Sequence, residues 1–310
     1  MNEFKAFDSM IFHRVLVEGQ KNRISNVVLK NLQIIITELK KSIKNRENNS
    51  ILKLQSEISK FIEENYNKLQ SEFVNELQEL LDYESDYQNE WLNKTVEETP
   101  ENNLLTESAA IAGLLLISKS VKLSRKETRN IIDKRPVRGA TFKEQINQQK
   151  YQLKEMVRRN VVTGINDNAS DEEIIAEVQK TFNKNKAGTE AMLKTVVNAH
   201  TNEVAIETYK KNGFKNYKYV AIMDDKTTEI CSYLNGQVFE IDKGPLPPQH
   251  YGCRSFVIPV IIKNGEVTEF KEFSNRKGDV RITTNEKGNF KKNNNFDFSL
   301  SKMKKEEYIW

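Results

Sequence analysis

The chain has 310 residues, of which 30% are charged, and a formal net charge of +4. This length predicts about two domains, and the mean hydropathy of −0.66 favours long amphipathic helices over one compact sphere. Two cysteines exclude a fold built on a disulfide framework. The longest strongly apolar run, Ala109 to Ile117, is too short to cross a bilayer, which needs about 20 residues. The start, MNEFKAFDSM, lacks a secretory pattern, so we expect synthesis in a cytoplasm and no membrane span.

Charge is distributed unevenly along the chain. Residues 1–110 hold 13 Lys and Arg against 19 Asp and Glu, a net charge of −6. Residues 119–159 hold 13 Lys and Arg against 4 Asp and Glu, a net charge of +9. An acidic section followed by a basic one predicts two surfaces with different partners.

Two stretches near the start carry apolar residues at helical spacing. The first runs from Ile24 to Ile43 and the second from Ile51 to Leu80, with the polar run Asn48 to Ser50 between them. Each stretch has one apolar face, so the pattern predicts two antiparallel helices joined by a short turn. A further apolar helix is expected over 107–119, after a linker that begins at Glu97.

Three helix starts are marked by capping boxes, in which Ser or Thr is followed three positions later by Glu: Ser124/Glu127, Thr141/Glu144 and Ser170/Glu173. They predict helices that begin near residues 125, 142 and 171. Gly164 is expected to end the second of these helices in a left-handed conformation. Another helix is expected over 189–211, closed by Asn212 and Gly213.

Beyond residue 215 the pattern changes to short segments rich in β-branched and aromatic residues. These are Tyr217 to Met223, Gln237 to Ile241 and Ser255 to Ile262. The predicted fold class is therefore mainly α with a small C-terminal β-rich module (α+β). Long amphipathic helices precede short antiparallel strands around a Pro-rich loop that carries Cys and His.

The expected organisation is four consecutive segments. Residues 1–100 form a helical hairpin or bundle, and 101–134 a helical connector. Residues 135–262 form a domain that ends in the β module at 216–262. The polar tail, 263–310, is expected to be partly disordered by itself and ends in an apolar tip.

Cys231, His250 and Cys253 are ligands that suit soft or borderline metals. The dipeptide Pro247-Pro248 is expected to hold the approach to His250 extended. The guanidinium of Arg254, which follows Cys253, is expected to pair with Asp224 or with its neighbour Asp225 and close the module.

These residues resemble the C-terminal motif of the phage Mu protein F-like minor head (head-morphogenesis) proteins of tailed bacteriophages. The order and spacing that match are those of Asp224, Thr227, Cys231, Gly236, Pro247, Pro248, His250, Cys253 and Arg254. The resemblance extends over about 135–262 and includes the segment Gly139 to Glu144, which is similar to the family's sequence before a long helix.

The sequence departs from the family at two positions. Thr228 and Ser255 stand where the family often has cysteines, which rules out a site of four thiolates. Three interpretations of Cys231, His250 and Cys253 stay open. They hold a structural zinc ion with Asp224 or Asp225 as the fourth ligand, or the cysteines form a disulfide after release from a reducing cell, or the cluster is reduced and metal-free.

The resemblance implies a structural and assembly protein of low copy number. It would bind near the portal vertex, contact the portal or the capsid interior, and lie against packaged DNA in the head of the virion after assembly in the host cytoplasm. No cofactor other than the candidate zinc ion is expected. The alternatives are a zinc-dependent nuclease or toxin-type enzyme, and a non-specific DNA-binding protein.

No catalytic residues are expected, because the sequence has no phosphate-binding loop and no G-x-S-x-G motif. His13 and His200 are isolated and are expected at the surface or at an interface. Five basic residues are candidates for contact with DNA phosphates or the portal: Lys134, Arg135, Arg138, Arg158 and Arg159. The alternative for them is a solvated face or one that meets an acidic protein surface.

Overall fold

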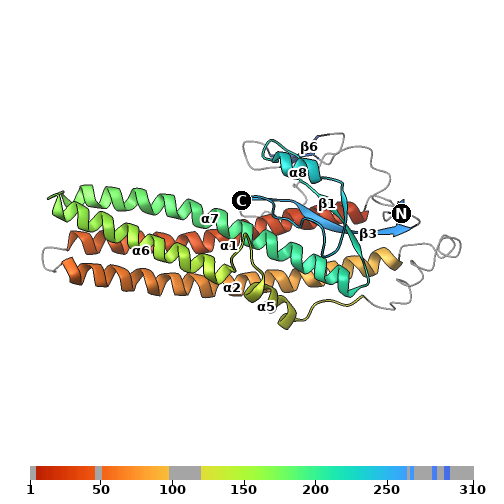
Figure 1. The fold of residues 1–310 in the computed structure, drawn as a ribbon, viewed down its shortest axis with the longest axis horizontal. Coiled ribbons are helices and arrows are strands. Elements are labelled where there is room, and N and C mark those ends of the chain that lie inside the picture. The colour runs from red at the N-terminus through yellow and green to blue at the C-terminus, as the bar shows by residue number, and fades with distance from the viewer. Residues whose placement is uncertain are drawn as a thin grey trace. The chain divides into compact units, whose positions relative to one another are not determined.

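The computed structural model describes residues 5–45, 51–97, 120–263, 266–268, 281–284 and 290–293. The elements are α1 (Lys5–Lys44), α2 (Ile51–Glu97), α5 (Arg125–Lys134), α6 (Phe142–Asn166), α7 (Asp171–Lys211), β1 (Asn216–Val220), α8 (Glu229–Leu234), β2 (Val238–Glu240), β3 (Phe256–Lys263), β4 (Glu266–Thr268), β5 (Arg281–Thr284) and β6 (Phe290–Asn293) (Figure 1). The predicted fold class, mainly α with a small β module, is confirmed.

The chain divides into two compact units. The first contains Met1–Asn22, Gln78–Ile131 and Val197–Trp310, and the second contains Arg23–Leu77 and Ile132–Val196. Each unit is therefore assembled from separate stretches of sequence. The division into four consecutive segments expected from the sequence stays a prediction.

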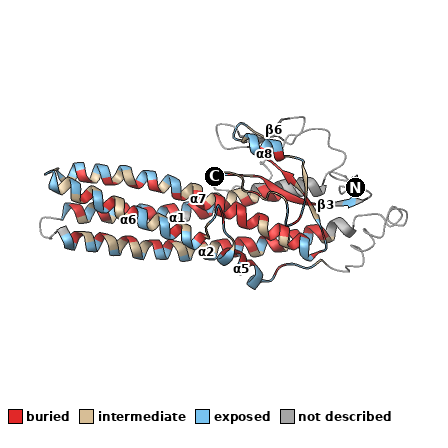
Figure 2. Ribbon diagram, viewed as in Figure 1, coloured by how far each residue is buried: buried red, intermediate tan, exposed pale blue. Residues whose placement is uncertain are grey.

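The second unit is a helical bundle, and its first two helices are antiparallel, as predicted. Arg23 pairs with Glu76 at 2.7 Å, and Asn31 donates a hydrogen bond to Glu72, so residue numbers rise along α1 as they fall along α2. The apolar positions between are buried: Ile24, Leu32, Ile35, Leu39 and Ile43 from α1, and Leu54, Ile58, Ile62, Leu69, Phe73 and Leu77 from α2. Figure 2 shows such buried residues as stripes that alternate with exposed ones along the helices.

Helices α6 and α7 complete this bundle. The ring of Phe142 lies 4.5 Å from that of Phe73, and the hydroxyl of Tyr66 donates to Oδ1 of Asn185 at 2.9 Å. A Cβ atom at Gly164 would lie 2.5 Å from Cγ1 of Ile174, so this glycine lets α6 and α7 approach closely. The prediction that Gly164 ends the helix is wrong.

All three predicted capping boxes are present at the starts of α5, α6 and α7. In each, the Glu carboxylate accepts from the backbone N–H of the capping residue at 2.7–2.8 Å. The expectation of a separate helix over 189–211 is wrong, because α7 runs unbroken through Gly188. A Cβ at Gly188 would meet nothing within 4 Å, and a glycine inside a long helix costs only about 1 kcal/mol.

The end of α7 follows the prediction. Gly213 has a φ of +83°, and the N–H of Phe214 donates to the carbonyl of Tyr209 at 3.0 Å. A left-handed glycine with this backward hydrogen bond is a common helix terminus. It directs the chain into β1.

In the first unit, β1 is the central strand of an antiparallel sheet with the order β2-β1-β3-β4. Tyr217 faces Phe239 of β2 and Pro259 of β3 in register. Residues of α2, α7, β1 and β3 share one apolar cluster: Trp91, Leu92, Ala205, Ile206, Tyr209, Phe214, Tyr217, Val220, Ile222, Ile241, Phe256, Val257 and Ile258. The three predicted strands are confirmed, whereas α8 was not expected.

A buried polar network in the first unit joins α1, α2, α7 and β3. Glu84 is fully buried, lies 3.2 Å from Arg14, and shares a hydrogen bond of 2.7 Å with His13. Gln88 donates to Glu84 at 2.7 Å and accepts from the hydroxyl of Tyr209 at 2.8 Å. Burial lowers the pKa of His13, so Arg14 is the fixed positive charge beside Glu84.

His13 and His200 are both completely buried, so the prediction that they lie at a surface or interface is wrong. The ring of His13 stacks on Tyr87, with centroids 3.5 Å apart. Burial with Glu84 and an aromatic ring gives His13 a structural role.

Several predicted features lie outside the described residues. These are the turn at 48–50, the apolar helix at 107–119, the linker that begins the connector, and most of the tail, of which the structure describes β4 and the antiparallel pair β5–β6. None of the helices that the structure describes is both long and apolar enough to cross a membrane.

Replacement of Glu84 by Gln should destabilise the protein by about 3–5 kcal/mol at pH 7, because buried Arg14 loses its counter-charge. Burial opposes ionisation of Glu84, but the charge of Arg14 and the hydrogen bonds from His13 and Gln88 outweigh it and hold its pKa at about 2. The stability due to this carboxylate is complete above its ordinary pKa of 4.5 and is lost as the pH falls toward 2.

Urea unfolding at several pH values measures this effect. The matched control is Glu79→Gln, an exposed carboxylate in the same helix. Equal urea midpoints for the Glu84→Gln and Glu79→Gln variants at pH 7 would contradict the proposed role of the buried pair.

Candidate metal centre

The site begins where β1 leads into a turn that includes Asp224 and Thr227. The hydroxyl of Thr227 donates to the carbonyl of Ile222 at 2.6 Å and accepts from the N–H of Asp224 at 2.8 Å. The carboxylate of Asp224 accepts from the N–H of Lys226 at 2.9 Å. These bonds fix the turn and set the start of α8.

Arg254 closes the site across this turn, as predicted. Its guanidinium donates to both carboxylate oxygens of Asp224, to Oδ2 at 2.5 Å. The Asp224 side chain is 4% exposed and that of Arg254 is 19% exposed. Burial opposes the charge on Asp224, but the hydrogen bonds and charge of Arg254 outweigh it and lower the pKa of Asp224.

His250 and Cys253 are the first and last residues of a tight turn. The N–H of Cys253 donates to the carbonyl of His250 at 3.3 Å, and Gly252 has a φ of +71°. A positive φ at the third turn position is the reason for glycine there. The peptide bond Pro247-Pro248, just before this turn, is cis.

The imidazole of His250 is oriented by the same turn. Nδ1 lies 2.9 Å from the carbonyl oxygen of Tyr251. A carbonyl only accepts, so Nδ1 carries the proton and Nε2 keeps its lone pair. Metal-bound histidines commonly have their second nitrogen oriented in this way.

The structure brings Cys231, His250 and Cys253 together. Their ligand atoms lie within 4.8 Å of one another, and this cluster could hold a metal ion. The two sulfur atoms are 3.7 Å apart, both cysteines are free, and the hydroxyl of Tyr219 lies 3.3 Å from the sulfur of Cys231. Two thiols and an imidazole are a donor set that zinc prefers.

The hydrogen bond between the two sulfur atoms shifts the pKa values of the two thiols in opposite directions. The hydrogen bond between the two sulfur atoms lowers the pKa of Cys231 to about 5, against the effect of burial. The same hydrogen bond, together with burial, raises the pKa of Cys253.

The expected fourth ligand, Asp224 or Asp225, is not part of the cluster. Among the described residues the cluster contains only Cys231, His250 and Cys253. Asp224 is directed to Arg254 instead, and both of its oxygens are occupied. Among the described residues, three protein ligands are thus assembled.

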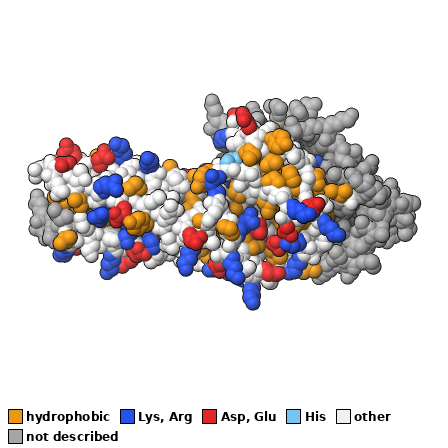
Figure 3. All heavy atoms as spheres, in the orientation of Figure 1, with side chains coloured by type: hydrophobic (Ala, Val, Ile, Leu, Met, Phe, Trp, Pro, Cys, Tyr) orange, Lys and Arg blue, Asp and Glu red, His pale blue; other side chains and the backbone are white. Residues whose placement is uncertain are grey.

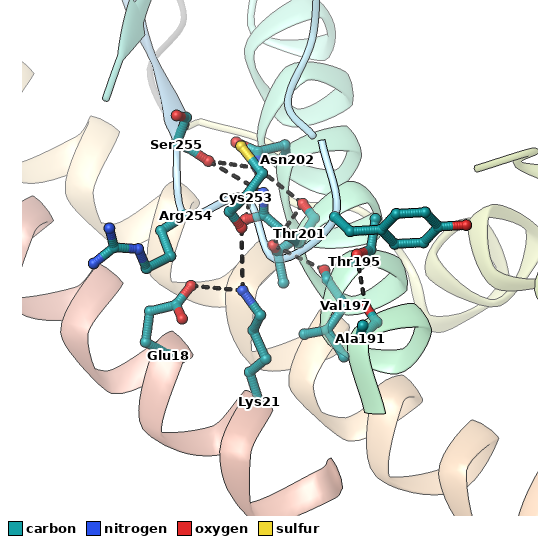
Figure 4. A network of polar contacts seen from close by, with 12 residues as sticks. Glu18, Lys21, Ala191, Thr195, Val197, Thr201, Asn202, Cys253, Arg254 and Ser255 are labelled. Carbon is teal, nitrogen blue, oxygen red and sulfur yellow. Dashed lines mark hydrogen bonds and ion pairs between the residues drawn. The ribbon is translucent and has the colours of Figure 1, made fainter. Parts of the chain in front are cut away.

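Polar side chains from two helices anchor the segment that carries Cys253 (Figure 4). Lys21 of α1, which is 2% exposed, donates to the carbonyl of Cys253 at 3.2 Å and pairs with Glu18 at 2.9 Å. Asn198 and Asn202 of α7 both donate to the carbonyl of Ser255, at 3.4 and 3.2 Å. These anchors were not predicted from the sequence. The one available signal was Lys21 itself, which interrupts the apolar spacing between Val17 and Ile24.

The predicted basic residues all lie in the second unit and do not form one uniform set. Lys134, Arg138 and Arg159 are exposed, Arg135 is half-buried, and Arg158 pairs with Glu155 at 3.0 Å. Figure 3 shows Lys and Arg side chains interspersed with Asp and Glu on the visible face.

Residues 151–258 match the model of a family described as Phage Mu protein F like protein. The predicted resemblance is confirmed over this segment, which contains α7, β1, α8, β2 and the turn with His250 and Cys253. It supports a structural role in phage head morphogenesis and association with the virion, and it is consistent with a protein that is not an enzyme. No curated protein and no solved structure matches the chain significantly.

Asp224→Asn should destabilise the protein by about 3–5 kcal/mol at pH 7, because it leaves the largely buried Arg254 without a counter-charge. Asp225→Asn changes an exposed neighbour and should cost less than about 0.5 kcal/mol. Thermal unfolding of both variants measures the difference.

The pH dependence of this difference follows from the lowered pKa of Asp224. Its contribution is complete above the ordinary value of 3.8 and is lost as the pH falls below that value. Equal losses in the two variants would show that the Asp224–Arg254 pair does not close the site.

Proposed function

We propose that this protein is a minor head protein of a tailed bacteriophage that associates with the portal vertex and the head interior. The observation that carries the proposal is the family match over 151–258, because this segment also contains the residues that pair or cluster in three dimensions. The described part of the chain before that match adds the long helices α1 and α2 and the short helix α5.

The helical part and the β module suit different tasks. Residues 1–110 carry a net charge of −6 and contribute α1 and α2, on which most of the exposed residues are polar. Such faces suit contacts with other proteins of the head. The β module is closed by the Asp224–Arg254 pair and anchored by Lys21. It would therefore keep its conformation when it binds a partner.

The cluster of Cys231, His250 and Cys253 supports a structural zinc ion as part of this proposal. The ion would bind the thiolates of Cys231 in α8 and of Cys253 in the turn before β3, and would so link these two segments. The preset orientation of His250 supports a metal over a chance meeting of three side chains. Dialysis against zinc followed by elemental analysis should find one ion per chain, and less than one per chain in His250→Ala.

An enzyme is the less favoured function. Among the described residues the one group of His, Cys, Asp and Glu side chains suited to a metal contains no carboxylate that could act as a general base. Metal-dependent cleavage of DNA by the pure protein, abolished by His250→Ala, would favour a nuclease over a head protein.

The proposed portal association is tested by co-expression. The tagged chain and the portal protein of the same phage should copurify and elute together in size exclusion. The proposed contact is between these two proteins and does not require packaged DNA. Separate elution of the two proteins at physiological salt would contradict a direct portal contact.

Weak, sequence-independent contact with DNA is a second part of the proposal. Residues 119–159 have a net charge of +9, while the remainder of the chain sums to −5. Four of the candidate residues are exposed: Lys134, Arg138 and Arg159, and Arg158, which pairs with Glu155. The first three are taken as phosphate contacts. Three phosphate contacts give a slope of about −2.7 in a plot of log affinity against log salt concentration.

Binding titrations at several salt concentrations measure this slope. Arg138→Gln combined with Arg159→Gln should flatten it by about 1.8. The matched control is Lys180→Gln with Lys184→Gln, two exposed positions of the same unit. A slope that changes as much in the control as in the arginine variant would assign the basic segment to protein contacts.

A further inference from the structure

The two cysteines are the only ones in the chain, and the fold places them side by side. Cys231 lies in α8, and Cys253 ends the turn before β3. They are 22 residues apart in sequence, yet their sulfur atoms are 3.7 Å apart. Both side chains are buried, at 1% and 0% exposure, and both are free thiols.

We propose that Cys231 and Cys253 form a reversible intramolecular disulfide, which locks α8 to the turn before β3 and excludes metal from the cluster. The pair is thus a redox modification site of the β module.

The geometry needs only a small movement. The sulfur atoms of a disulfide are about 2.05 Å apart, and those of Cys231 and Cys253 are 3.7 Å apart. The two sulfur atoms must therefore approach each other only by the difference between these distances. Rotation of the two side chains, with a slight shift of α8, supplies this approach. The short helix α8 is followed by Gly236, whose φ is +83°. Because glycine is conformationally permissive, the turn after α8 can change its backbone angles as the helix shifts.

The Cys253 side of the pair is the fixed one. Its carbonyl accepts from buried Lys21 (Figure 4). Asp224 holds the next residue, Arg254, and Asn198 and Asn202 hold Ser255. Closure of the disulfide therefore ties α8 to a segment that is already anchored to α1 and α7. The ring encloses β2 and the Pro-rich loop, and it restricts that loop in the unfolded chain.

The chemistry balances with a peroxide as the oxidant. The thiolate of Cys231 attacks hydrogen peroxide, an S–O bond forms, the O–O bond breaks, and the released hydroxide takes a proton to become water. The sulfur of Cys253 then attacks the Cys231 sulfur, the S–O bond breaks, and a second water leaves. The cysteines lose two electrons and two protons, and the peroxide is reduced to water.

Metal binding and disulfide formation exclude each other, because zinc needs the same two thiolates. Only His250 would remain as a ligand after oxidation. The time at which the disulfide would form rests on the proposed function. A phage head protein passes from a reducing cytoplasm to an oxidising exterior, and the cysteines would be oxidised after that passage.

The test uses the full chain, reduced and metal-free, treated with one equivalent of hydrogen peroxide. Intact mass spectrometry should show a monomer that has lost two hydrogens, and peptide mapping should join Cys231 to Cys253. The Tm should rise by about 5 °C because a ring of moderate size has closed. A titration with Zn²⁺ should load the reduced chain and leave the oxidised chain empty.

Variants separate the pair from its surroundings. His250→Ala keeps both cysteines and should still form the disulfide, while its reduced form binds less Zn²⁺. Cys231→Ser and Cys253→Ser should form no internal cross-link.

Several results on the unaltered chain would overturn the proposal. They are two thiols that stay titratable, sulfinic acid in place of a cross-link, disulfide-linked dimers, a lower Tm after cross-linking, or equal Zn²⁺ binding by both forms. None of these would bear on the head role, which the portal experiment tests separately.

Discussion

The ion pair between Asp224 and Arg254 is the contact on which the arrangement of the site depends. It joins two stretches that are 30 residues apart, and both carboxylate oxygens of Asp224 accept from the guanidinium. A largely buried pair of this kind adds little net stability. Conformations that leave one of the two charges buried without the other are nevertheless strongly disfavoured. Because Cys231 follows the first stretch and Cys253 precedes Arg254, the pair brings the two sulfur atoms to the same place. It also explains why Asp224 is not a metal ligand.

Much of the fold could be predicted because it depends on local chemistry. The capping box at Ser170 marks a helix start to within a residue, and the left-handed Gly213 marks the end of α7. The errors arose where distant packing decides. The sequence around Gly164 gives no reason for a glycine inside a helix. The reason is the close approach of the Ile174 side chain from a neighbouring helix, which leaves no room for a Cβ atom. A separate helix was expected over 189–211, whereas the 41 residues of α7 form one unbroken helix.

The site was predicted in its composition and in one of its contacts. Motif spacing identified Cys231, His250 and Cys253, and the chemistry of arginine identified its pairing with Asp224. The contact of Lys21 with Cys253 could not be predicted, because 232 residues separate the partners and no motif links them. The burial of His13 was missed for the same reason, since Glu84 lies on another helix. Buried charged residues within apolar stripes are the signal to search for in such sequences.

Residues 1–150 precede the family match, and Lys21 of α1 anchors Cys253 within it. The proposed head role treats both parts of the chain as one component. The most direct test is quantitative mass spectrometry of purified procapsids and mature virions of the phage that encodes it. The account predicts peptides from both the N-terminal helices and the β module in both particles, in equal amounts and at low copy number relative to the major capsid protein. Absence of the protein from procapsids and virions alike would contradict the account.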